Sequence, residues 1–150
     1  MSGNEDERAA AYMQRMVDKI SKYGHMVQSV FPAEGDVGVP FSYTVGRTIQ
    51  RAPELLITGP LPTQVQAALL NDAAVIEDLA AGQERDDLIQ GGVMRVVSVD
   101  ARASEMFQAI YLFEPTPIRA LQLVWPDTQG RFPNDEGYDQ ERFPQPVRFG

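Results

Sequence analysis

Segments with two different hydrophobic periods alternate along this sequence, and this alternation limits the fold more than any other feature. Three segments repeat apolar side chains every three to four residues, as amphipathic helices do: residues 4–23, 63–81 and 104–111. Five shorter segments have the alternating or continuously apolar pattern of strands: residues 25–31, 41–46, 55–58, 93–99 and 118–125. The sequence therefore predicts an α+β fold, in which about three helices pack on a mostly antiparallel mixed sheet of about five strands.

The ends of the expected helices carry capping signals. Asn4, Thr63 and Ser104 each stand at the start of a helical pattern and have side chains that accept hydrogen bonds from a first helical turn. Gly24 and Gly82 follow the first two patterns, and glycine readily adopts the left-handed conformation that ends a helix. We expect these residues to mark helix boundaries.

A change of composition divides the chain into a domain and a C-terminal arm. The 150 residues suit one domain with a sizeable core, which we expect to span residues 1–126. Residues 127–150 are rich in proline and glycine and show no hydrophobic period, so we expect an irregular arm packed on the domain or on a neighbouring subunit. The arm's aromatic side chains are the candidate interface residues: Phe132, Tyr138, Phe143 and Phe149.

Composition and charge argue against several classes of protein. The absence of cysteine removes thiol catalysis, cysteine-zinc sites and iron–sulfur clusters. No apolar run is long enough to span a membrane, and the first residues lack the apolar region of a signal peptide, so we expect a cytoplasmic protein without a membrane partner. The net charge is −8, and residues 76–150 carry 7 basic and 13 acidic side chains. Such a chain repels a phosphate backbone, which argues against nucleic-acid binding.

The residue types that build metal and cofactor sites are scarce. There is no glycine-rich phosphate loop and only one histidine, His25, which we interpret as a packing residue at a strand start. Transition-metal sites draw mainly on thiolate and imidazole, so we expect neither a tight metal site nor a cofactor. The adjacent carboxylates Asp86 and Asp87 lie in a polar connection and are expected to be solvated.

Two segments combine residues that both pack and form hydrogen bonds. One runs from Phe41 to Leu55 and the other from Leu121 to Pro133. If the ends of their strands share one edge of the sheet, Arg47 and Glu54 lie close to Asp127 or Arg131. Such a cluster could clamp an anionic or planar ligand, or it could be an internal network that pins the loops. The candidate ligand-binding residues are Tyr43, Arg47, Glu54, Gln122, Trp125, Asp127 and Arg131.

The same two segments carry a family resemblance. Tyr43-Thr44-Val45-Gly46, Pro53-Glu54-Leu55 and the run from Leu121 to Asp127 with Gly130-Arg131-Phe132-Pro133 resemble the bacterial domain-of-unknown-function family numbered 4262. The resemblance extends over about residues 20–138. A histidine often precedes Pro-Glu-Leu in that pattern, where this chain has Ala52, and a tryptophan often follows Phe-Pro, where it has Asn134. The resemblance implies a coherent fold but carries no assigned reaction.

These observations favour a small acidic protein that acts through binding surfaces and forms a homo-oligomer. An enzyme or small-ligand-binding domain built on the candidate cluster is the alternative. A second alternative is an acidic mimic that occupies a basic surface on a protein partner, although acidic surfaces also serve solubility. The sequence leaves open whether the protein is an enzyme and favours a binding role.

Overall fold

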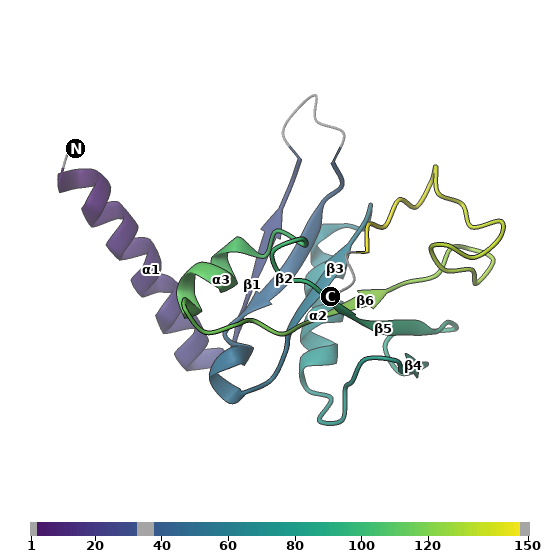
Figure 1. The fold of residues 1–150 in the computed structure, drawn as a ribbon, viewed down its shortest axis with the longest axis horizontal. Coiled ribbons are helices and arrows are strands. Elements are labelled where there is room, and N and C mark those ends of the chain that lie inside the picture. Colours follow the sequence, from purple (N-terminus) through teal and green to yellow (C-terminus); the bar gives the residue numbers. More distant parts are fainter. Residues whose placement is uncertain (1–2, 33–37, 148–150) are drawn as a thin grey trace.

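A mixed sheet with helices on both faces forms the centre of the molecule (Figure 1). The computed structural model describes residues 3–32 and 38–147. In this part of the chain the elements are, in order, α1 (Gly3–Tyr23), β1 (Met26–Val30), β2 (Phe41–Val45), the short 3-10 helix η1 (Arg47–Gln50), β3 (Glu54–Thr58), α2 (Thr63–Ala74), β4 (Glu84–Arg85), β5 (Met94–Val99), α3 (Phe107–Phe113) and β6 (Ala120–Val124).

The six strands described form one sheet in the order β1-β2-β3-β6-β5-β4. Neighbouring strands are antiparallel except β3 and β6, which run parallel with Glu54 beside Ala120 and Leu56 beside Gln122. The last strand is therefore inserted between β3 and β5. This arrangement confirms the α+β class and the mostly antiparallel mixed sheet.

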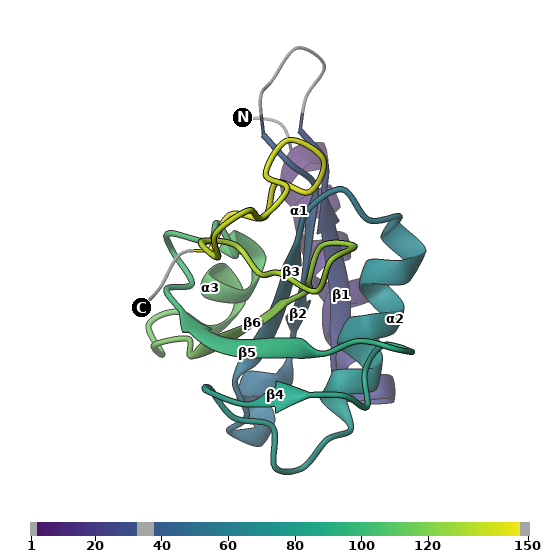
Figure 2. The same cartoon turned by 90° about the vertical axis from the view of Figure 1, so that its right-hand side faces the viewer.

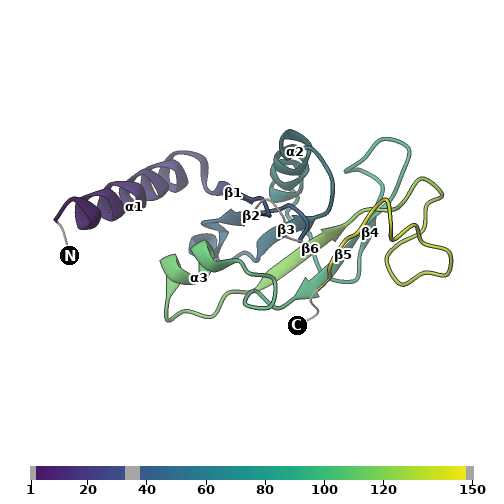
Figure 3. The same cartoon turned by 90° about the horizontal axis from the view of Figure 1, so that it is seen from above.

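Each face of the sheet has its own hydrophobic core. Helix α2 covers one face, and α3 with the C-terminal half of α1 lies on the other, as the view from above shows (Figure 3). The α2 core includes Leu55, Leu70 and Leu123, while the opposite core includes Met16 and Tyr43. Successive β-strand side chains point to opposite faces, which is why β3 and β6 supply both cores and read as continuous apolar runs.

Helix α1 ends where the sequence predicts and fits closely against the β2 terminus. Gly24 has a φ of +88° and its amide donates to the Ile20 carbonyl, as in a glycine-terminated helix. Gly46, with a φ of +124°, lies against Ile20 so closely that a Cβ atom would stand 2.8 Å from the Ile20 side chain. Glycine is therefore required where β2 turns toward η1.

Several predicted details are wrong. Asn4 lies within α1, which already begins at Gly3. Thr63 is the first residue of α2 and not its cap, because the Pro62 carbonyl accepts the Val65 and Gln66 amides. Ser104 does not cap α3: Met106 occupies that position, and the Ser104 hydroxyl has no hydrogen-bond partner among the described residues.

Helix α2 is also shorter than expected, and the region after it supplies an extra strand. The Arg47 guanidinium donates to the Ala74 carbonyl, the group to which a continuing helix would bond the amide of residue 78. The helix ends there, so Gly82 does not terminate it; instead its amide donates to the Val96 carbonyl of β5. The following two-residue strand β4 makes the sheet one strand larger than predicted (Figure 2).

The C-terminal arm runs irregularly and packs on its own domain. Gln145 bridges the arm to β6, because its Nε2 donates to the Trp125 carbonyl at 2.7 Å and its Oε1 accepts the Trp125 amide at 3.0 Å. The Phe143 ring meets the Trp125 ring edge-on at 5.6 Å, and Phe132 is buried beneath the Arg95 guanidinium. Phe149 lies outside the described residues.

None of the described helices is both long and apolar enough to cross a bilayer.

We predict that Gln145→Ala destabilises the protein by about 1–3 kcal/mol, because truncation leaves the backbone amide and carbonyl of Trp125 buried without partners. Chemical denaturation measures the change. Gln140→Ala is the matched control, since Gln140 is exposed on the same arm. Equal stability of both variants and the parent would show that the Gln145 bridge does not stabilise the fold.

Candidate functional site

A buried carboxylate organises one end of the sheet. Glu54, the first residue of β3, is completely buried and accepts hydrogen bonds from the Thr44 hydroxyl at 2.8 Å, the Thr48 amide at 2.8 Å and the Thr48 hydroxyl. The amides of Gly46 and Arg47 also donate to it, each at 3.2 Å. All of these donors converge on one carboxylate, which thereby fixes the β2–η1–β3 connection.

Arg47 links this connection to the end of α2. Its Nε donates to the Pro53 carbonyl at 2.7 Å and its Nη1 to the Ala74 carbonyl at 2.8 Å. Burial lowers the pKa of the Arg47 guanidinium, and the neighbouring Glu54 carboxylate opposes that shift. The cation also lies at the negative end of the α2 dipole. Arg47 is therefore a structural brace between the η1–β3 connection and the end of α2.

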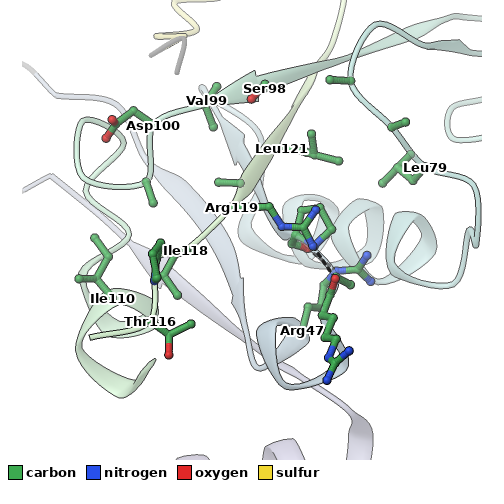
Figure 4. A pocket seen from close by; sticks show the side chains of 18 of the residues that line it. Arg47, Leu79, Ser98, Val99, Asp100, Ile110, Thr116, Ile118, Arg119 and Leu121 are labelled. Atoms are coloured by element: carbon green, nitrogen blue, oxygen red, sulfur yellow. Dashed lines mark hydrogen bonds between the residues drawn. The ribbon is translucent and has the colours of Figure 1, made fainter. Parts of the chain in front are cut away.

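A broad groove of about 1010 Å³ opens beside this brace (Figure 4). Its walls are the η1–β3 turn, the segment after α2, the end of β5 and the connection from α3 to β6. Apolar side chains line much of it, among them Leu79, Ile110, Ile118 and Leu121. The volume is at the upper end of the range for pockets that hold small organic ligands.

Guanidinium groups enter this groove from several elements. Arg119, just before β6, crosses the groove and donates to the Arg51 carbonyl, as the dashed line in Figure 4 shows. Arg51 itself is exposed and has a φ of +60°. Arg47 and Arg102 complete the set. Within the described part of the chain, none of these four guanidinium groups has a carboxylate within 4.0 Å.

The acidic lining residues are Glu77, Asp100 and Glu114. Four cationic and three anionic side chains thus line the groove, whereas the whole chain has 13 basic and 21 acidic residues. The groove is a locally cationic site on an acidic protein.

The predicted cluster does not form as one unit. Glu54 and Thr58 are the two ends of β3, and the Trp125 indole donates to the Thr58 carbonyl at 2.8 Å. Arg47 with Glu54 and Trp125 with its successors therefore lie at opposite ends of β3, about 13 Å apart along the strand. The expectation that Arg47 and Glu54 lie close to Asp127 or Arg131 is wrong, because β3 and β6 run parallel.

The remaining predicted residues are buried in separate structural networks. Tyr43 lies in the core opposite α2, its hydroxyl accepts the Gln108 amide at 3.0 Å, and burial raises the pKa of its phenol. The Gln122 Nε2 donates to the Pro146 carbonyl at 2.9 Å and to the Thr58 hydroxyl at 3.1 Å. These contacts hold the sheet and the arm together. The contacts described for Tyr43 and Gln122 do not show whether these residues bind a ligand.

Asp127 organises the start of the arm. Its carboxylate accepts the Gln129 and Arg131 amides, each at 2.9 Å, and the Asp139 amide at 3.2 Å. The Arg131 guanidinium forms an ion pair with it at 3.0 Å. Burial raises the pKa of Asp127, but these hydrogen bonds outweigh burial and hold the pKa below its ordinary value.

The single histidine and the paired aspartates lie outside the groove. His25 Nε2 is 2.8 Å from the Asn71 side-chain oxygen. Asp87 pairs with Arg85 at 2.7 Å, and this hydrogen bond lowers the pKa of Asp87. Among residues 3–32 and 38–147, no three histidine, cysteine or acidic side chains gather as a metal site would require. The expected lack of metal and cofactor stays a prediction.

Sequence reasoning missed the groove residues Arg51, Arg102 and Arg119. Each is an isolated arginine in a connection, so no local motif marks it. One feature of the sequence could have pointed to these residues: the chain has eleven arginines and two lysines, and three of the arginines flank strands. Ala52, where the family pattern often has a histidine, also lines the groove.

We predict that Glu54→Gln destabilises the protein by about 2–4 kcal/mol. The amide keeps one acceptor oxygen but presents an NH₂ group to buried donors, so at least one donor loses its partner. Urea denaturation gives the difference. Glu77→Gln, the same change at an exposed position, is expected to alter stability by less than about 0.5 kcal/mol. Equal effects of the two changes would contradict the organising role of Glu54.

The pKa of Asp127 predicts a pH dependence. Because its folded pKa is depressed, its stabilisation is present above the unfolded pKa of about 3.9 and is lost as pH falls through the folded value. The stability difference between the parent and Asp127→Asn is therefore expected to be constant above about pH 5 and to shrink below about pH 4. Denaturation curves across this range measure it. A difference that stays constant down to pH 2 would argue against the depressed pKa.

Comparisons with known proteins identify the family of this domain but assign no activity to it. No curated protein and no solved structure matches the chain. The model of one family, described as a domain of unknown function (DUF4262), matches residues 19–139, which include the whole sheet, the groove and the start of the arm. The chain belongs to the DUF4262 family.

Proposed function

We propose that this protein binds a small organic anion, a carboxylate or phosphate with an apolar portion, in the arginine-lined groove. One observation carries the proposal. The Arg119 guanidinium is held against the Arg51 backbone, beside a second exposed arginine, and neither has a carboxylate partner among the described residues.

The chemistry of the guanidinium group supports an anionic ligand. A guanidinium has five N–H donors in a planar fork that matches carboxylate and phosphate oxygens. Arg119 uses a donor on a backbone carbonyl, which orients the group while leaving other donors for a ligand. Neighbouring cations repel one another, and a bound anion relieves this repulsion.

The groove walls indicate the rest of the ligand. Leu79, Ile118 and Leu121 supply apolar surface next to the arginines. A ligand with an aliphatic or aromatic body would bury that body there while its anionic group meets Arg119 and Arg51. Because Glu54 and Arg47 fix the surrounding turn, the site is preorganised, which reduces the entropy cost of binding.

Binding without catalysis is the function that these residues support best. Ser98 and Asp100 line the groove, but both are exposed, and the Asp100 side chain accepts the Ala103 amide of its own turn. Nucleophilic catalysis requires a base within hydrogen-bond reach of the nucleophile.

Two predictions from the sequence also remain part of the proposal. They are the cytoplasmic location and a protein partner with a basic surface.

We predict that Arg119→Gln weakens anion binding at least tenfold while leaving the fold intact. Native mass spectrometry of the purified protein identifies a co-purifying anion, and calorimetry with a panel of aliphatic and aromatic carboxylates and phosphomonoesters measures affinity. Arg8→Gln is the matched control, because it removes the same charge from an exposed helix position outside the groove.

Two results would overturn the proposal. One is that no member of the panel binds the parent protein at millimolar concentration and none co-purifies. The other is that Arg119→Gln and Arg8→Gln reduce binding equally, which would show general charge attraction instead of a site.

A further inference from the structure

Helix α1 extends well beyond the domain that it anchors. Its 21 residues make it about 31 Å long. Every residue from Asn4 to Tyr12 is exposed, whereas Met16 and Ile20 are buried against the sheet. Figures 1 and 3 show, from two directions, the N-terminal half of α1 projecting away from all other elements. The family match begins at residue 19, so this half is also outside the shared domain.

The projecting half continues the apolar stripe of the anchored half. Ala9, Met13, Met16 and Ile20 follow one another at spacings of three and four, so all four lie on one side of the helix. Met13 is half-buried at the edge of the core, and Ala9 is exposed. Tyr12, on the same side, is 37% exposed and makes a 3.2 Å hydrogen bond to Gln28. A helical stretch this short is marginal in water unless its apolar face is covered.

A second exposed apolar group lies on the next helix. Phe107 and Tyr111, one turn apart on α3, are 53% and 75% exposed. The inner side of α3 shares a core with the anchored half of α1, because Ala109 and Met16 belong to the same cluster. Helix α3 and the anchored half of α1 therefore lie on the same face of the sheet.

The charges of α1 are divided between its halves. The first turns contain Glu5, Asp6 and Glu7, with Arg8 as their one cation, and all four are exposed. The second half contains the exposed cations Arg15, Lys19 and Lys22, with Asp18 as the one anion. The two halves carry net charges of opposite sign. An antiparallel pair of such helices places each acidic half beside a basic half, and it also aligns the helix dipoles favourably.

We propose that two copies of this chain associate through an antiparallel pair of α1 helices. In this dimer the projecting half of each α1 packs beside the basic half of the partner's α1 and covers the exposed aromatic rings of its α3. A two-fold axis near the middle of α1 makes the surface self-complementary, as cyclic dimers require. A second copy is the occupant that fits best, because the helix itself contains both charge partners.

Charge reversal tests this arrangement. One variant is Glu5→Lys with Glu7→Lys, and the other is Lys19→Glu with Lys22→Glu. Each is expected to raise the dimer dissociation constant at least tenfold, because like charges then face one another across the pair. An equimolar mixture of the two is expected to form a heterodimer, since the reversed halves complement each other. Multi-angle light scattering of the full chain over a concentration series measures each state.

The matched control is Val75→Glu, which adds a charge at an apolar residue that is 79% exposed next to α2. It is expected to remain as dimeric as the parent. Circular dichroism and melting temperature show whether each variant folds. A parent protein that is monomeric at 0.1–1 mM (roughly the upper range for a weak dimer) overturns the proposal, as does a dimer that both reversals leave unchanged.

Cross-linking provides a second readout that does not depend on the charge variants. The chain has no cysteine, so a single cysteine can be introduced at Tyr12, which is exposed near the middle of α1 on the side of its apolar stripe. Mild oxidation is expected to link this variant into a covalent dimer, whereas a cysteine at the exposed Asp72 on α2 remains unlinked. Equal linking at both positions, or none at Tyr12, contradicts an α1 pair.

Discussion

The buried carboxylate of Glu54 is the constraint on which this end of the molecule depends. It lies at the start of the central strand β3 and gathers hydrogen bonds from the end of β2 and from η1. A completely buried carboxyl group is tolerated only when its oxygens have hydrogen-bond partners, so the connection has little freedom. Arg47 extends the same constraint to α2 by capturing the carbonyl at which that helix ends. The hydrogen bonds of Glu54 and Arg47 therefore set the shape of the groove wall.

The two ends of the parallel strands β3 and β6 consequently differ in character. At the opposite end, Trp125 and Gln145 tie the arm to the sheet, and Gly59 has no side chain because a Cβ atom there would stand 2.6 Å from the indole ring. That end is filled. At the Glu54 end the connections stay apart and arginines line the space between them. The fold thus separates a closed structural end from an open, cationic one.

The sequence predicted the elements well and their juxtaposition poorly. Periodicity located the three α-helices and all described strands but β4, because burial on one or both faces leaves a local pattern; it missed the short helix η1. The cap at Thr63 was wrong because the Pro62 carbonyl accepts the first amides of α2, and those at Asn4 and Ser104 were wrong because α1 begins at Gly3 and α3 only after Met106. The proposed cluster failed because its premise, that two strand ends share an edge, depends on β6 pairing parallel to β3. Arg119 was missed since only tertiary structure brings it beside Arg51.

The central claim is that the Glu54 end of the sheet holds a preorganised anion site centred on Arg119 and Arg51. Nuclear magnetic resonance of the ¹⁵N-labelled protein tests it directly, by following the arginine side-chain Nε–H signals during titration with an anion. We expect the signals of Arg119 and Arg51 to shift together and to saturate, while those of Arg8 and Arg142 stay in place. Shifts of similar size at all exposed arginines that never saturate, and that weaken as salt is added, would contradict the account.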